Sequence, residues 1–227
     1  MLKPKKKITK KEMKKDPVLE KISQVDTFVR NNPKQLLYGA LGIVVVVALI
    51  VLLAQSKKSA NREASGELGM AEIALAKGDI DDAVVRLEAL IEKNPRTKSA
   101  GMATLLLAQS YLAKSDYEKA QENFEKYVDD YDDDYMIEAS ALNGVGLCLD
   151  HKGEYEKAAK MYTEAIEESP YKFQRHEYSL NAVRSLIKIN ELKKAEELVQ
   201  EVLDGEPDYK AKNAAEQLQS QIEALKN

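Results

Sequence analysis

The residues that could carry out chemistry in this chain are few and stand apart from one another. The two histidines, His151 and His176, are 25 residues apart, with no companion cysteine and no repeated carboxylate spacing. They therefore do not form a metal-ligand pattern. Cys148 is the single cysteine, so no internal disulfide can form. In an expected helix it is most simply a small buried residue and not a nucleophile.

The acidic run at 129–134 invites a calcium interpretation. A calcium loop of the EF-hand type needs oxygen ligands at alternate positions, a central glycine and a distal glutamate, and the glycine is absent. We expect a solvated turn there. The glycines never form a rich run followed by Lys and Ser or Thr, so no phosphate loop is present. We therefore predict that the chain is not an enzyme and uses no metal or cofactor.

Charge divides the chain into two unlike parts. Residues 1–35 carry eleven Lys and Arg against four acids, a net charge of +7. The remainder carries 23 basic and 34 acidic residues, a net charge of −11. An acidic domain lacks the basic face that phosphate contacts require, so nucleic acid is excluded as a partner.

One segment is apolar enough to cross a membrane. Residues 36–54 read LLYGALGIVVVVALIVLLA, nineteen residues without a charge. In a helix they would span roughly 28 Å, close to the thickness of a bilayer's hydrocarbon core. A buried core helix would be shorter and would keep a polar face. A cleaved signal peptide would have a shorter apolar stretch and a small-residue cleavage site. We predict a retained transmembrane helix.

Orientation follows from the basic residues that flank this helix. Close to the helix, the numbers of Lys and Arg on its two sides are equal. Over its full length, however, the N-terminal flank carries eleven Lys and Arg. Since such flanks tend to stay inside the cell, we expect a cytoplasmic N-terminus and a C-terminal domain on the other side of the membrane. Residues 1–15 read as a disordered basic tail. Residues 16–35 begin with an Asp-Pro helix start and carry an apolar stripe, which predicts an amphipathic helix at the membrane interface.

The segment after the membrane helix repeats itself. A small residue recurs at Ala83, Ala120, Ala158 and Ala195, with spacings of 37, 38 and 37 residues. Turn signals precede each of them, and Pro95, Pro170 and Pro207 close three of the units. A fixed period of this kind indicates a stack of helical hairpins that share one core. We place four repeats at about 64–97, 101–134, 139–172 and 176–209, within a domain spanning 59–227, and a capping helix at 209–226.

These units resemble tetratricopeptide repeats. The third matches through Gly146, Ala158, Tyr162, Ala165 and Pro170. The period exceeds the 34 residues usual for the family, which implies longer first helices or longer turns between repeats. The expected fold class is all-α, a tetratricopeptide-like solenoid behind a single transmembrane helix.

Such stacks bind other proteins, usually on a groove lined by the first helices of the repeats. In the register above, the candidate groove positions share that first-helix location: Leu68, Glu72, Leu105, Gln109, Asn143, Leu147, His151, Leu180 and Arg184. Only Asn143 and Arg184 could contribute to a clamp for a C-terminal carboxylate. The mixture of apolar and polar residues is better suited to an extended or helical protein segment.

The whole arrangement resembles the YfgM-like family, ancillary subunits of the Sec translocon with a periplasmic repeat domain. The resemblance lies in the order of parts and in a leader with Val18, Val25, Phe28, Val29 and Asn32. It implies a bacterial inner (cytoplasmic) membrane with the repeat domain in the periplasm. It also implies a non-enzymatic partner of translocon subunits, exported clients or periplasmic chaperones. Two alternatives stay open: a scaffold for another envelope complex (division, outer-membrane assembly or secretion), and a cytosolic docking platform if the orientation is reversed.

Overall fold

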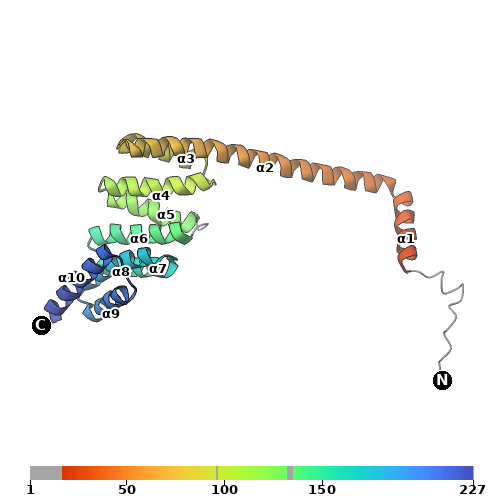
Figure 1. The fold of residues 1–227 in the computed structure, drawn as a ribbon. Helices are drawn as coiled ribbons and strands as arrows, with labels where there is room; N and C mark the ends of the chain where they lie inside the picture. Colours follow the sequence, from red (N-terminus) through yellow and green to blue (C-terminus); the bar gives the residue numbers. More distant parts are fainter. Residues whose placement is uncertain (1–16, 96, 132–134, 227) are drawn as a thin grey trace, which may run out of the picture. The chain divides into compact units, whose positions relative to one another are not determined.

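The computed structural model describes residues 17–95, 97–131 and 135–226, and the predicted basic tail lies outside them. Every regular element in these ranges is an α-helix, as predicted for the fold class (Figure 1). The chain divides into two compact units, Met1–Ser56 and Lys57–Asn227. They are described separately below.

The first unit contains helix α1, Pro17–Asn31, and the start of α2, Pro33–Ala76. Asn32 separates the helices because proline disfavours a helical conformation at the residue before it. Both the backbone N–H and the side-chain amide of Asn32 donate to the carbonyl oxygen of Phe28, at 3.0 and 3.1 Å. The apolar stripe of α1 includes Ile22, Val25 and Phe28, all of which are exposed.

Helix α2 is 44 residues long and continues without a break from the apolar segment into the first repeat. Its best 18-residue window has a mean hydropathy of 3.0, and none of that window is buried in the chain. By length and composition it can therefore cross a membrane. Residues 36–54, where the membrane helix is expected, and the start of the first repeat both fall within the bounds of α2.

The second unit is a stack of hairpins closed by a last helix (Figure 1). The end of α2 pairs with α3, and the later helices follow in order: α3 Ile80–Lys93, α4 Lys98–Ala113, α5 Tyr117–Asp130, α6 Tyr135–His151, α7 Tyr155–Glu168, α8 Lys172–Lys188, α9 Leu192–Asp204 and α10 Tyr209–Lys226. The first helices α4, α6 and α8 have 16 or 17 residues, whereas the second helices have 13 or 14. Helices α4, α6 and α8 begin three or four residues before the starts expected for their repeats.

Each hairpin turns through one residue with a positive φ. These residues are Gly78 (φ 80°), Ser115 (φ 60°), Gly153 (φ 80°) and Asn190 (φ 61°). The next backbone N–H then donates to a carbonyl five residues back, as from Asp79 to Ala74 and from Glu191 to Leu186, both at 2.9 Å. This is the Schellman closure of a helix C-terminus, and it satisfies carbonyls that the helix leaves without partners.

Two glycines of α6 permit close approach of the neighbouring second helices. A Cβ at Gly144 would lie 2.6 Å from the ring of Phe124, and one at Gly146 would lie 2.6 Å from the ring of Tyr162. Phe124 and Tyr162 are 2% and 1% exposed. A small residue is therefore needed at Gly146, because the ring of Tyr162 in the same repeat occupies the space that a side chain would fill.

One hydrophobic cluster runs from Ala64 to Ala182 and joins the first three hairpins to the start of the fourth. A second cluster joins α8, α9 and α10, where Ala215, Leu218 and Ile222 are buried. Because each hairpin buries its apolar side against the next, the stack is the unit that folds.

Candidate protein-binding surface

The nine candidate groove residues lie on the first helices, and eight of them, all but His151, form two rows that differ in their exposure. The first row holds one residue per repeat: Leu68, Leu105, Asn143 and Leu180. Leu105 is 6% exposed and Leu180 is 5% exposed, and Leu68 packs against the main core cluster. Leu68 and Leu105 thus belong to the main cluster, and Leu180 belongs to the second cluster, formed by α8, α9 and α10.

The second row faces solvent. It consists of Glu72, Gln109, Leu147 and Arg184, of which only Leu147 is partly buried. A third row, which the sequence reasoning missed, lies three residues before the first: Ser65, Met102, Ser140 and Glu177, all exposed or half-buried. The fixed repeat spacing carried that signal, because these positions share a face with the second row. We call these two solvent-accessible rows the first-helix face.

His151 is exposed at the end of α6 and stacks on Tyr117 of α5, with ring centroids 4.3 Å apart and planes at 11°. It is positioned by an aromatic contact at the edge of the stack. Among the described residues, no three His, Cys, Asp or Glu side chains come together in a way that could hold a metal ion.

A hydrogen-bonded chain of polar groups crosses from the third repeat to the fourth. The amide nitrogen of Asn181 donates to Oδ1 of Asn143 at 3.0 Å, and Arg184 donates to Oδ1 of Asn181 at 2.9 Å. Ser185 donates to Oδ1 of Asp150 at 2.7 Å. Asn143 is 9% exposed, so its amide is used inside the protein to fix the register of α6 and α8.

A hollow of about 310 Å³ lies between α8 and α10. Leu180, Ala211 and Ala214 supply apolar surface, and Arg184 and Lys210 supply two cations. Phe173, 63% exposed, lies at this hollow and stacks on Tyr171 with centroids 5.7 Å apart. An apolar pit with charged groups around it is suited to a side chain of a bound peptide.

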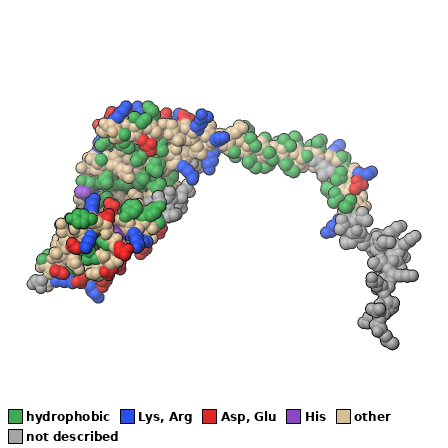
Figure 2. Space-filling model, in the orientation of Figure 1, with side chains coloured by type: hydrophobic (Ala, Val, Ile, Leu, Met, Phe, Trp, Pro, Cys, Tyr) green, Lys and Arg blue, Asp and Glu red, His purple; other side chains and the backbone are tan. Residues whose placement is uncertain are grey.

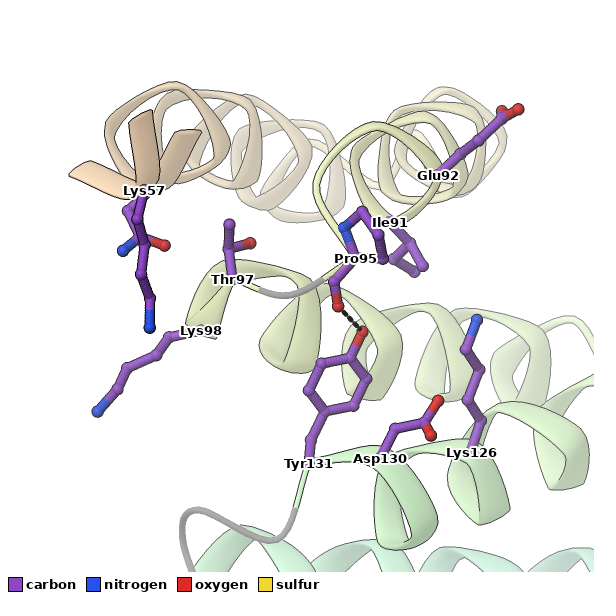
Figure 3. A pocket seen from close by; sticks show the side chains of 10 residues that line it. Lys57, Ile91, Glu92, Pro95, Thr97, Lys98, Lys126, Asp130 and Tyr131 are labelled. Atoms are coloured by element: carbon purple, nitrogen blue, oxygen red, sulfur yellow. Dashed lines mark hydrogen bonds between the residues drawn. The ribbon is translucent and has the colours of Figure 1, made fainter. Parts of the chain in front are cut away.

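A wider hollow of about 750 Å³ lies among the helices of the first two repeats (Figure 3). The hydroxyl of Tyr131 donates to the carbonyl oxygen of Pro95 at 2.8 Å and ties together the loops that follow α3 and α5. Lys57, Lys98 and Lys126 contribute the cations of its lining. Sequence reasoning did not find this hollow, because residues from four helices meet there only once the hairpins stack.

Burial controls the ionisable groups inside the stack. Burial raises the pKa of the Cys148 thiol to about 11, so the thiol is neutral and unreactive at physiological pH. Burial, then the hydrogen bond to Glu88 at 2.5 Å, raises the pKa of Tyr111 to about 12. Burial and the nearby Lys172 and Arg175 lower the pKa of His176. These groups lie in the scaffold, and none is arranged as a catalytic set with another.

Comparison with known families identifies the repeats. Two tetratricopeptide-repeat models match the chain, one over residues 67–97 and the other over residues 99–167. The chain therefore contains tetratricopeptide repeats, as the spacing of small residues predicted. No curated protein matches the chain in sequence.

Solved structures share this fold at low sequence identity. The pilF protein of Pseudomonas aeruginosa matches with a TM-score of 0.58 and 18% identity, over 74% of this chain and 71% of its own. A tetratricopeptide-repeat protein of Parabacteroides merdae matches with a TM-score of 0.61 and 15% identity, over 72% of this chain and 61% of its own. MamA of Desulfovibrio magneticus matches with a TM-score of 0.55 and 15% identity, over 72% and 94%. At these identities the likeness concerns the fold alone.

Proposed function

We propose that this tetratricopeptide-repeat chain is a membrane-anchored binding subunit of the bacterial envelope. In this proposal it is an ancillary factor of the Sec translocon and of the periplasmic chaperone network. Tetratricopeptide domains bind other proteins, and the described residues include no group of His, Cys, Asp or Glu that could hold a metal ion. The order of parts, an apolar segment followed at once by repeats, supports a role beside a membrane complex.

The observation that carries the proposal is the first-helix face. It offers one solvent-accessible row from Glu72 to Arg184 and a second from Ser65 to Glu177, each with one residue per repeat. The hollow between α8 and α10 lies where both rows end. A row of evenly repeated positions suits an extended or helical segment of another protein, because such a segment also repeats its side chains at regular intervals.

The charge distribution supports the proposed topology. The basic tail with its net charge of +7 suits the anionic inner leaflet, whereas residues 36–227 with their net charge of −11 do not. A periplasmic repeat domain tethered by a continuous α2 would stay close to the site where exported chains emerge.

The partner is tested by site-specific photo-crosslinking in intact membranes. A photoreactive amino acid replaces Gln109 on the first-helix face, and the matched control replaces Ser220, which is exposed on α10. We expect translocon subunits or exported chains to be captured from position 109 and not from position 220. Capture of division or outer-membrane assembly proteins alone would favour the scaffold alternative and reject the translocon role.

Orientation is tested by protease accessibility. Protease added to intact spheroplasts should digest the repeat domain, and the same domain should survive in inside-out vesicles. The opposite pattern would place the repeats in the cytosol and reject the proposed topology.

A further inference from the structure

The part of α2 that follows the apolar segment carries basic residues and no acid. Residues 55–62 contain Lys57, Lys58 and Arg62, all of them exposed. Residues 36–227 as a whole carry a net charge of −11, so three cations without an acid are a local exception in an acidic domain. Figure 2 shows basic side chains gathered at the edge of the repeat unit where α2 enters it.

Lys57 lines the hollow of about 750 Å³ together with Lys98 of α4. Both lysines lie on the same side of the Tyr131 ring (Figure 3). The two acids of the lining, Glu92 and Asp130, lie on the other side of that ring. None of the ion pairs among the described residues involves either lysine. One side of the hollow is therefore basic.

The start of α4 adds to the positive potential beside Lys98. Thr97 fixes this start, because its hydroxyl donates to the carbonyl oxygen of Asn94 at 2.9 Å and accepts from the N–H of Ala100 at 3.1 Å. A helix start carries a partial positive charge, and the first turns of α3, α5, α6 and α7 each contain an acid that offsets it. The first turn of α4 contains none and opens with a lysine. An anion beside Lys98 would supply the missing negative charge.

The place of Lys57 in the chain indicates which anion is within reach. Lys57 follows Ala54, the last residue of the apolar segment, by three residues. Three residues span at most about 11 Å. The headgroup layer on each side of a bilayer is about 5–8 Å thick. Chain connectivity alone therefore keeps Lys57 in or beside the headgroups when the apolar segment crosses a membrane.

We propose that the basic side of this hollow, formed by Lys57, Asn61, Thr97 and Lys98, binds the phosphate of an anionic phospholipid headgroup. The two ammonium groups supply the charge, and the half-buried amide of Asn61 can donate a hydrogen bond to a phosphate oxygen. Because the rest of the domain is acidic, the attraction is confined to this site. A lipid bound there would hold the first two repeats at the bilayer surface. The inference rests on the membrane anchor of the proposed function, but not on the direction in which the chain crosses the bilayer.

The first experiment measures the acetylation rate of individual lysines of the full chain in lipid nanodiscs, by mass spectrometry of its peptides. With phosphatidylglycerol in the discs, Lys57 and Lys98 should react about threefold or more slowly than in discs of phosphatidylcholine alone. The matched control is Lys77, an exposed lysine just beyond the other end of α2, whose rate should be the same in both kinds of disc. Equal rates at Lys98 in both kinds of disc would overturn the proposal.

Two further measurements identify the source of the phosphate and separate this inference from the anchor. Inorganic phosphate added to phosphatidylcholine discs should leave the rate at Lys98 unchanged, and protection equal to that by phosphatidylglycerol would reject a lipid as the ligand. A chain that does not remain with the discs would reject the anchor and this inference together. A chain that remains with the discs but keeps an unprotected Lys98 would reject this inference alone.

Lys98→Glu tests the site by reversing one charge without weakening the fold. A carboxylate in the first turn of α4 complements the helix start, so the circular dichroism spectrum should be unchanged. The slowing of Lys57 by phosphatidylglycerol should shrink to less than about twofold, because the phosphate would meet a carboxylate. Lys77→Glu makes the same change of charge away from the hollow and should leave the slowing intact. Undiminished protection of Lys57 in Lys98→Glu, or an equal loss in both variants, would contradict a shared site.

Discussion

Replacing Gly146 with alanine tests whether the close contact between α6 and α7 limits the stability of the third repeat. An alanine Cβ would lie 2.6 Å from Cε1, 2.7 Å from Cδ1 and 3.0 Å from Cζ of Tyr162. The ring is 1% exposed, so it can move away only by displacing the core. Overpacking of this kind costs about 1–3 kcal/mol. Alanine gains about 1 kcal/mol over glycine in helix propensity.

The expected result is a net loss of roughly 0–2 kcal/mol in the free energy of unfolding for Gly146→Ala. The propensity gain is measured separately at Gln109, which is exposed in the middle of α4. There Gln109→Ala should be more stable than Gln109→Gly by about 1 kcal/mol. The difference between the two sites isolates the clash, at about 1–3 kcal/mol.

The assay is urea unfolding of the full chain in detergent, followed by far-ultraviolet circular dichroism and tyrosine fluorescence. Coincident transitions are required, since repeat arrays can unfold in parts. In a Tyr162→Leu background the penalty of Gly146→Ala should shrink, because the ring atoms are gone. If Gly146→Ala instead stabilises the chain as much as the glycine-to-alanine exchange at position 109, the packing argument is wrong.

Three further predictions concern the helix ends and one half-buried histidine, His176. Asp116→Ala should cost about 1 kcal/mol in urea unfolding because its side chain caps the N-terminus of α5, whereas Glu191→Ala, with no side-chain cap bond, should cost little. Ser115→Gly should raise the melting temperature because the residue has φ 60°, and Asn190→Gly should raise it less because asparagine tolerates this conformation. The pKa of His176 is lowered in the folded protein, so the free energy of unfolding should fall as the pH drops below about 6.5, the pKa of an unfolded histidine. His176→Gln should remove that part of the fall. If the variant and the wild type lose stability equally with falling pH, His176 is not the group responsible.

Local sequence signals were enough to predict the hairpins. The recurring alanines gave the period, and the turn signals lie where the structure has Gly78, Ser115, Gly153 and Asn190 in the left-handed conformation. The period of 37 or 38 residues left two explanations open, and first helices of 16 or 17 residues account for it. The start of α4 was expected three residues too late, although Thr97 just before Lys98 is a favoured N-cap residue and its hydroxyl oxygen accepts from the N–H of Ala100 at 3.1 Å.

The binding surface was less predictable than the fold because burial depends on neighbouring hairpins. Leu105, Asn143 and Leu180 occupy the same register as residues that could face a groove, yet the neighbouring helices of the stack bury them. Asn143 is committed to Asn181, a bond between residues 38 positions apart. Periodicity reports which side of one helix is apolar. It does not report how much of that side the next helix removes from solvent.

The sequence alone determined that this chain has a segment able to cross a membrane and a stack of tetratricopeptide repeats. These properties depend on composition and spacing along the chain, which are local. The tertiary structure decided that α2 runs unbroken from the apolar segment into the first hairpin. It also decided that Met70 and Ile73 are exposed while their equivalents in the later repeats are buried. The same kind of residue at the same repeat position is core where a hairpin precedes it and surface where none does.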